Sequence, residues 1–240
     1  MLNPLKQFSV YSIVDLNVFG YNFAITNSTI ALFTVYLILL VLCRIACLRI
    51  NLVPGKIQAC GEAIFKMIDE LLYSTAGKNS KQFCPLIFTL FGFILVSNLM
   101  SIIPFAFATT SHFSVTFILA MFIFALVTIV GFIKNGLSYL SILLPKGTPI
   151  FLAPLMIIIE LFAYLARPIS LSIRLAANMT AGHVVLEVLA SFIILSGIFG
   201  ALPLILLTIL TGFEMLVAIL QAYIFAILSC AYLSDALNLH

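Results

Sequence analysis

Long runs without a charged residue constrain this chain more than any other feature. Residues 82–133 contain no Asp, Glu, Lys or Arg at more than fifty consecutive positions. A helix that crosses a bilayer needs about 20 mostly apolar residues, so this run is long enough for two spans. Pro104 and the polar segment 107–112 (FATTSH) predict the turn between them. Because 64% of all residues are apolar and only 8% are charged, the sequence excludes an ordinary soluble fold and predicts an all-α polytopic membrane protein.

The same reasoning divides the chain into about five spans within a single membrane domain, residues 1–240. We expect a first span at 29–43, a helical hairpin at 84–106 and 113–133, and two long helices at 148–196 and 203–234. The segment 44–81 holds six of the eleven Lys and Arg residues, and its apolar residues recur at roughly helical spacing. This pattern favours an interfacial amphipathic helix at 56–76, with a solvated loop as the alternative.

Lysine and arginine also predict the orientation of the chain. By the positive-inside rule, the segment 44–81 and the segment 134–146, which carries two lysines, lie on the inside. Five spans then place the N-terminus outside and the C-terminus inside. The first fifteen residues lack the apolar core of a signal peptide and the Arg-rich character of a transit peptide, so we expect the first span to act as its own insertion signal.

Composition and missing motifs argue against several classes of function. A net charge of +3 is too small for the basic patch that binds nucleic acid. The five cysteines have neither C-x-x-C spacing nor histidines at zinc spacing, so we expect small buried hydrophobes and no metal. No phosphate-binding loop and no HExxH or GxSxG motif occurs, so we expect no nucleotide chemistry, no cofactor and no intramembrane enzyme.

Charged residues inside the helix predicted at 148–196 are the first functional candidates, because an ionised side chain at bilayer depth costs about 2.5–3.5 kcal/mol. Glu160, Arg167 and Arg174 recur every seven residues and therefore share one helix face. Asn178 follows one turn later and extends this stripe, whereas His183 lies about 180° away from Arg174 on an ideal helix. Arg167 precedes a proline and could instead satisfy the backbone carbonyls that the proline leaves free.

A second polar stripe follows on the last helix. Glu214, Gln221 and Asp235 are spaced by seven and fourteen residues and share a face, so two facing stripes would form a water-filled path. The amides of Asn178 and Gln221 could equally be interhelical hydrogen bonds without a transport role. Arg174 stays charged in any surroundings, which suits a fixed electrostatic gate better than a proton carrier.

At this point the sequence resembles a known family. The segments SLSIRLAANMTAGHVVLEVLASF (170–192) and GFEMLVAILQAYIFAILSCAYLSDALNLH (212–240) are similar to the two signature helices of subunit a of the rotary F-type ATP synthase. The similarity continues through 147–170 and through SNLMSIIP (97–104), and so covers nearly the whole chain. The resemblance implies a pair of long tilted helices against a ring of c subunits, with two offset half-channels that carry protons to and from the ring carboxylate.

The resemblance also implies roles for single residues. Arg174 would be the essential arginine that separates the half-channels, with Asn178 and Gln221 as its polar neighbours. His183 and Glu214 would be the titratable groups of the outside half-channel, and Glu160 and Asp235 would line the inside one. Glu187 departs from the family pattern, so we expect no channel role for it.

Partners and location follow from the same resemblance. The partners would be the c-subunit ring, the peripheral-stalk subunit b, other ATP synthase subunits and the lipid bilayer. The transported ion would be the proton, because the stripes offer no dense oxygen cage for a dehydrated cation. We expect the bacterial plasma membrane, or the mitochondrial inner membrane if the chain is organelle-encoded. The competing hypothesis is a stand-alone secondary transporter with an anion bound at an arginine near the midplane.

Overall fold

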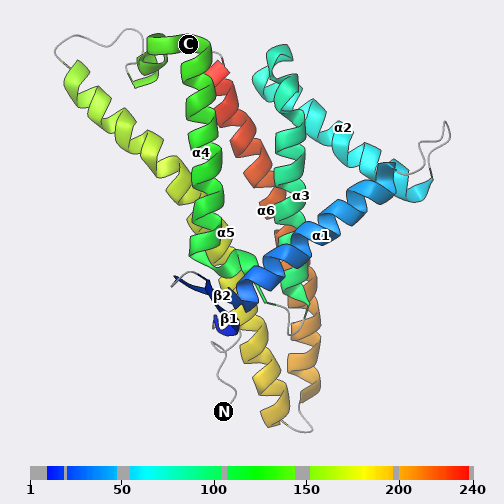
Figure 1. Ribbon diagram of the computed structural model, residues 1–240. Coiled ribbons are helices and arrows are strands. Elements are labelled where there is room, and N and C mark those ends of the chain that lie inside the picture. Colours follow the sequence, from blue (N-terminus) through cyan, green and yellow to red (C-terminus); the bar gives the residue numbers. More distant parts are fainter. Residues whose placement is uncertain are drawn as a thin grey trace.

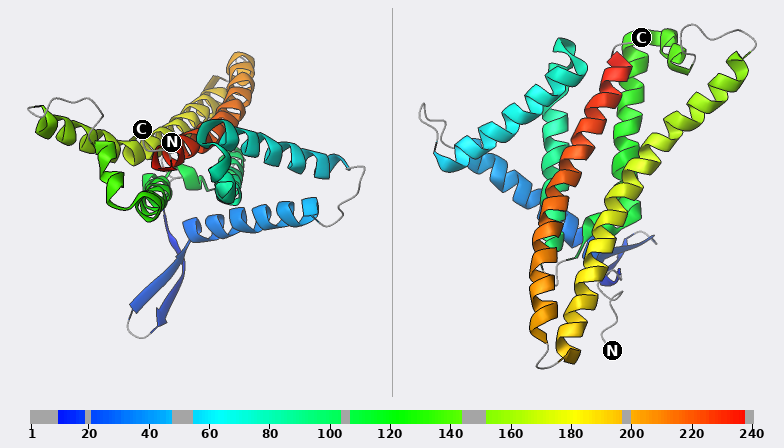
Figure 2. Two further views of the ribbon diagram at one scale, coloured as in Figure 1. Left: turned by 90° about the horizontal axis from the view of Figure 1, so that it is seen from above. Right: turned by 180° about the vertical axis from the view of Figure 1, so that it is seen from behind.

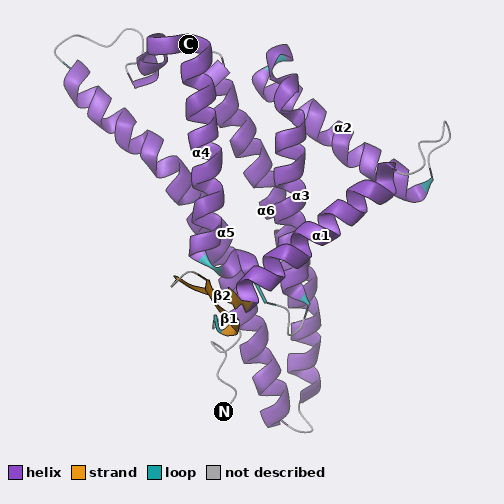
Figure 3. Cartoon of the chain, viewed as in Figure 1, coloured by secondary structure: helices purple, strands orange, loops and turns teal. Residues whose placement is uncertain are grey.

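Helices make up most of the structure, a computed structural model that describes residues 10–18, 21–47, 55–103, 107–143, 152–196 and 200–237. Among these residues, five helices are long and apolar enough to cross a membrane. They are α1 (Asn27–Cys47), α3 (Cys84–Ile102), α4 (Phe113–Asn135), α5 (Ala153–Ser196) and α6 (Ala201–Leu237). The predicted all-α polytopic fold with about five spans, two of them long, is confirmed (Figures 1 and 3).

A short β-hairpin precedes the first helix, and the sequence analysis did not predict it. Strand β1 (Ser12–Val18) pairs antiparallel with β2 (Tyr21–Thr26). Each strand has too few residues to span a bilayer as a helix, and each is rich in the β-branched and aromatic residues that favour strands. The first helix starts where the Thr29 amide donates a hydrogen bond to the Thr26 hydroxyl, at 3.4 Å. Residues 16–43 contain no charged residue, and the structure divides this run between the β-hairpin and α1.

Helix α2 (Lys56–Ala76) occupies the range expected for the amphipathic helix. Its buried residues Ile68, Leu72 and Ala76 recur every four positions and join the main core. The opposite face carries an exposed ion pair between Lys66 and Glu70, at 3.8 Å. One apolar stripe and one charged face are what a helix needs to lie along the side of a bundle.

The core forms where α3 packs against α6. Helix α3 contributes large side chains, including Ile87, Phe91 and Ile94, which are at most 4% exposed. Helix α6 contributes the small residues Ala218, Ala222 and Ala226 to this contact, all fully buried and one turn apart. Small residues at a helix–helix contact let the backbones approach closely, which is the usual way that membrane helices associate.

Helices α5 and α6 form one outer layer of the molecule. In the right-hand view of Figure 2 they run antiparallel in front of the other helices. Helix α5 has 44 residues and is about 66 Å long at about 1.5 Å per residue, roughly twice the thickness of the hydrocarbon layer. A helix of this length fits within a bilayer only at a strong inclination.

Candidate functional site

Members of the two polar stripes predicted on α5 and α6 contact each other at two levels of the helix pair. At one level the Asn178 side-chain amide donates a hydrogen bond to Oε1 of Gln221, at 3.0 Å. At a second level the guanidinium of Arg167 donates to Oδ2 of Asp235, at 2.8 Å. At a third level the carboxyl of Glu214 lies against the backbone at Gly182. Because the helices are antiparallel, these three contacts follow one another along the pair.

Arg174 lies one turn before Asn178, near the middle of α5, and its side chain is exposed. Within the described part of the chain it has no hydrogen-bond or ion-pair partner. Both helices also carry exposed apolar residues, among them Ile173, the residue before Arg174, and Leu220. A permanent positive charge in such a setting needs a partner outside the chain, because lipid cannot solvate it.

His183 and Glu214 lie on the buried side of the helix pair, at 5% and 6% exposure. The carboxyl of Glu214 fits because residue 182 is glycine: a Cβ atom there would lie 2.6 Å from Oε1 of Glu214. Neither carboxyl oxygen of Glu214 has a hydrogen-bond partner among the described residues. A buried carboxyl without protein partners is costly, so this position suits water or a bound proton.

Buried polar atoms continue from Glu214 to the end of α3 and to η3 (Thr109–Ser111). Thr109, Thr110 and Asn98 are at most 2% exposed, and an oxygen of each lacks a partner among the described residues. The hydroxyl of Thr180, on α5, donates to the Ser111 carbonyl at 3.2 Å. The Asn98 side chain donates to the Ala218 carbonyl, on α6, also at 3.2 Å. These groups therefore lie within a turn of His183 and Glu214 along the two helices.

The segment FATTSH (107–112) is predicted as a turn, and its buried hydroxyl groups are not evident from the sequence pattern. The available signal was three consecutive hydroxyl residues and a histidine in an apolar region. The ring of His112 stacks on Phe107, with centroids 4.9 Å apart, and burial lowers the pKa of this imidazole. Buried hydroxyl and amide groups of this kind are commonly satisfied by water.

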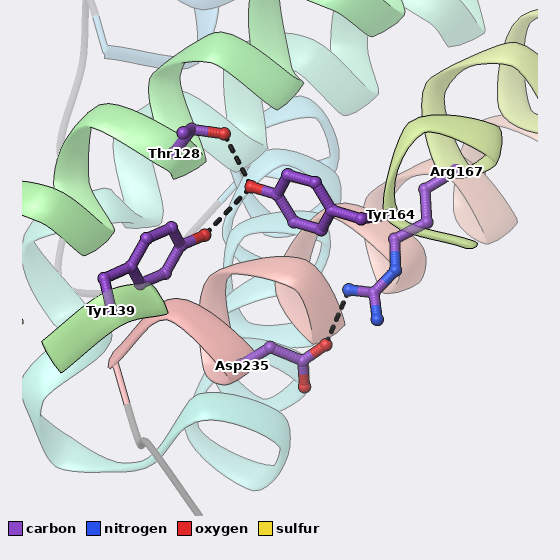
Figure 4. A network of polar contacts seen from close by, with 5 residues as sticks. All are labelled: Thr128, Tyr139, Tyr164, Arg167 and Asp235. Atoms are coloured by element: carbon purple, nitrogen blue, oxygen red, sulfur yellow. Dashed lines mark hydrogen bonds and ion pairs between the residues drawn. The ribbon is translucent and has the colours of Figure 1, made fainter. Parts of the chain in front are cut away.

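Toward the C-terminal end of α6, Arg167 forms an ion pair with Asp235, and Figure 4 shows this pair together with Tyr164. The guanidinium lies 5.6 Å from the ring centroid of Tyr164 and 5.3 Å from that of Tyr232. Asp235 is therefore the partner of Arg167, whereas the sequence suggested the carbonyls near Pro168. Glu160 lies two turns before Arg167, is half-buried, and has no polar partner in the described segments.

No group of three His, Cys, Asp or Glu side chains in the described segments lies close enough to hold a metal ion. The candidate site is thus a set of polar groups strung along α5 and α6. It combines a fixed surface cation, a buried carboxyl and imidazole, and a second acidic region near the end of α6. Carboxyl and imidazole side chains are the groups that bind and release protons in membrane proteins.

Comparison with known families gives one match. A sequence model of the family described as ATP synthase A chain matches residues 28–234. The matched range runs from α1 to the last turns of α6. It contains six of the seven residues singled out on the two stripes, and the seventh, Asp235, lies one residue beyond it.

Proposed function

The chain belongs to the ATP synthase A chain family, and we propose that its two polar stripes are two half-channels that carry protons to and from the carboxylates of a ring of c subunits. Membership makes the chain a multi-pass membrane subunit of the proton-conducting part of the enzyme, associated with other ATP synthase subunits. In this proposal, proton flow through the two half-channels couples the proton-motive force to rotation of the ring. Nucleotide chemistry belongs to other subunits.

The observation that carries the proposal is the position of Arg174. It is exposed near the middle of the long helix α5, on an apolar surface that faces away from the chain's own core. A ring carboxylate that passes this surface would meet a fixed positive charge and remain ionised there. A proton moving directly from one half-channel to the other would meet the same charge and be repelled. Protons would then have to travel around the ring.

We assign His183 and Glu214 to the outside half-channel because both are buried next to the polar groups of α3 and η3. Glu160 and Asp235 belong to the inside half-channel, near the C-terminal end of α6. The hydrogen-bonded pair of Asn178 and Gln221 lies between the two regions, next to Arg174.

The apolar surface of α5 and α6 suits the ring as a partner. Large exposed side chains follow both helices, for example Ile169 and Ile173 on α5 and Leu216 and Leu220 on α6. Subunit b and the remaining subunits are further proposed partners. The proposed location is the bacterial plasma membrane, with the mitochondrial inner membrane as the alternative. A stand-alone transporter would need an enclosed anion site, and the outward position of Arg174 argues against one.

The test is Arg174→Ala in the whole enzyme, assayed in inverted membrane vesicles. We expect ATP-driven proton pumping to fall to background, while ATP hydrolysis by the detached soluble part persists. Arg174→Lys should fail as well, because an ammonium lacks the planar fork of the guanidinium. Lys66→Ala is the control, since that side chain is 78% exposed in a surface ion pair and should pump normally. Pumping by Arg174→Ala at the wild-type rate would refute the proposal.

A further inference from the structure

We propose that Arg167 is a positioning residue that holds Asp235 as a fixed counter-ion, and that Glu160 is the acid that exchanges protons in the inside half-channel. This inference rests on the proposed function and gives different roles to the two inside acids. The ion pair and the side chains linked to it are called the Arg167 bracket below: Thr128, Tyr139, Tyr164, Arg167 and Asp235, which Figure 4 shows, and Tyr232.

The ion pair itself would hold the helices only weakly if it stood alone. The side chains of Arg167 and Asp235 are 26% and 46% exposed, and ion pairs that water can reach contribute little to stability. Here, however, Tyr164 on α5 and Tyr232 on α6 both lie within about 6 Å of the guanidinium, the range of a cation–π contact. The guanidinium is thus held by one ring from each helix and by the carboxylate.

The bracket is also anchored to α4 and to the segment that follows it. The hydroxyl of Tyr164 hydrogen bonds with the Thr128 hydroxyl at 2.6 Å and with the Tyr139 hydroxyl at 2.9 Å. Tyr139, in η4 (Gly136–Leu143), packs so closely on Gly131 that a Cβ atom there would overlap its ring. Burial, followed by the hydrogen bond with Tyr164, raises the pKa of Tyr139, so its hydroxyl stays neutral.

A further hydrogen bond fixes the last turn of α6 beside Asp235. The side-chain amide of Asn135, the last residue of α4, donates to the Ala236 carbonyl at 2.7 Å. Residues of four elements, α4, η4, α5 and α6, line a small cavity of ≈ 10 Å³ beside Asp235. That volume is close to the space of about one water molecule.

Asp235 and Glu160 differ in the freedom that proton exchange requires. A relay acid accepts and releases protons in turn and must reach water in both states. One oxygen of Asp235 accepts a hydrogen bond from the charged guanidinium of Arg167, and the other titratable side chains that line the adjacent cavity are tyrosines. Glu160, seven residues earlier on α5, is half-buried and has no such partner in the described segments. Of these two acids, Glu160 is therefore the one that combines an inside position with a carboxyl that lacks an ion-pair partner in the described segments.

The test compares neutral variants in the whole enzyme, with proton pumping in inverted vesicles and the amount of the subunit in the complex as readouts. Asp235→Asn and Arg167→Gln each leave one charge without its partner, so each should lower pumping by about fivefold or more. The double variant Arg167→Gln/Asp235→Asn removes both charges and should pump better than either single variant. Its pH profile should match that of the wild type. Glu160→Gln should lose pumping although the subunit assembles normally.

A different result is expected if Asp235 itself relays protons. If Asp235 relays protons, the double variant still lacks the relay acid and pumps no better than Asp235→Asn. That result, or a double variant that fails to assemble, overturns the inference, as does normal pumping by Glu160→Gln. Arg174→Ala in the same assay distinguishes a failure of the proposed function from a failure of this inference. If Arg174→Ala pumps protons, the proposed function is wrong. If it does not pump, a double variant that is not rescued refutes only the role of Arg167.

Discussion

Among single residues, Gly182 determines how closely a carboxyl of α6 approaches the backbone of α5. A Cβ atom at this position would lie 2.6 Å from Oε1 of Glu214 and 3.1 Å from its carboxyl carbon. Real Cβ contacts are longer, so any side chain at residue 182 would displace the carboxyl of Glu214. Because His183 is the next residue, this displacement would occur inside the proposed outside half-channel.

We therefore expect Gly182→Ala to lower proton pumping by about tenfold or more, since a displacement of about 1 Å can cost a reacting group two orders of magnitude in rate. Alanine favours the helix over glycine by about 1 kcal/mol, so the subunit should not be less helical. Gly212→Ala on α6 is the matched control, because a Cβ atom there meets nothing within 4 Å. Pumping and subunit content in vesicles check this prediction, and equal pumping by the two variants would contradict it.

The helical period explains which residue properties could be predicted from the sequence. Nine residues separate Arg174 from His183, which places them on opposite sides of a helix, and the structure has one exposed and the other buried. The partner of Arg167 could not be predicted in this way. It depends on the register of α5 against α6, and a repeat of seven residues on each helix allows several registers.

Among the elements, helix bounds followed from charges, whereas close approaches between elements did not. The absence of charges over 82–133 predicted the hairpin of α3 and α4, which the structure contains. The strands β1 and β2 were missed because short segments rich in β-branched and aromatic residues, with Asp15 as their one charged residue, resemble the polar end of a span. The packing of Tyr139 on Gly131 could not be predicted either. Tyr139 lies in η4, after the end of α4, and the sequence does not show that this segment folds back against α4.

This packing leads to a prediction about α4. Gly131→Ala should destabilise the contact between α4 and η4 by about 1–3 kcal/mol, because the new methyl group overpacks against the ring of Tyr139. Gly92→Ala on α3 is the matched control: its Cβ atom would meet only a terminal methyl of Leu39, at 2.8 Å, which can move aside. The two variants are compared by heating the purified enzyme and measuring how much of this subunit dissociates from the complex. Greater loss with Gly92→Ala would contradict the prediction.

For the whole molecule, the main consequence of the fold is that the two acidic regions lie at well-separated levels along the α5–α6 pair. Glu214 and Asp235 belong to the same continuous helix and are twenty-one residues apart. At about 1.5 Å per residue this separation is about 31 Å. That is close to the whole hydrocarbon thickness of about 30 Å. In Figure 1 the C-terminal end of α6 lies at the top of the view, far from the β-hairpin in the lower half.

The two regions should therefore be reached by water from different faces of the membrane. Single cysteines at positions 214 and 160, in a background without the five native cysteines, should react with membrane-impermeant thiol reagents from the outside and the inside, respectively. Position 160 is preferred to 235 because replacing Asp235 would leave Arg167 without its partner. A cysteine at position 225, where Phe225 is fully buried in the core, is the control and should react from neither face. Labelling of positions 214 and 160 from the same face would contradict two separate half-channels, because a single opening would then connect both acids and protons could bypass the ring.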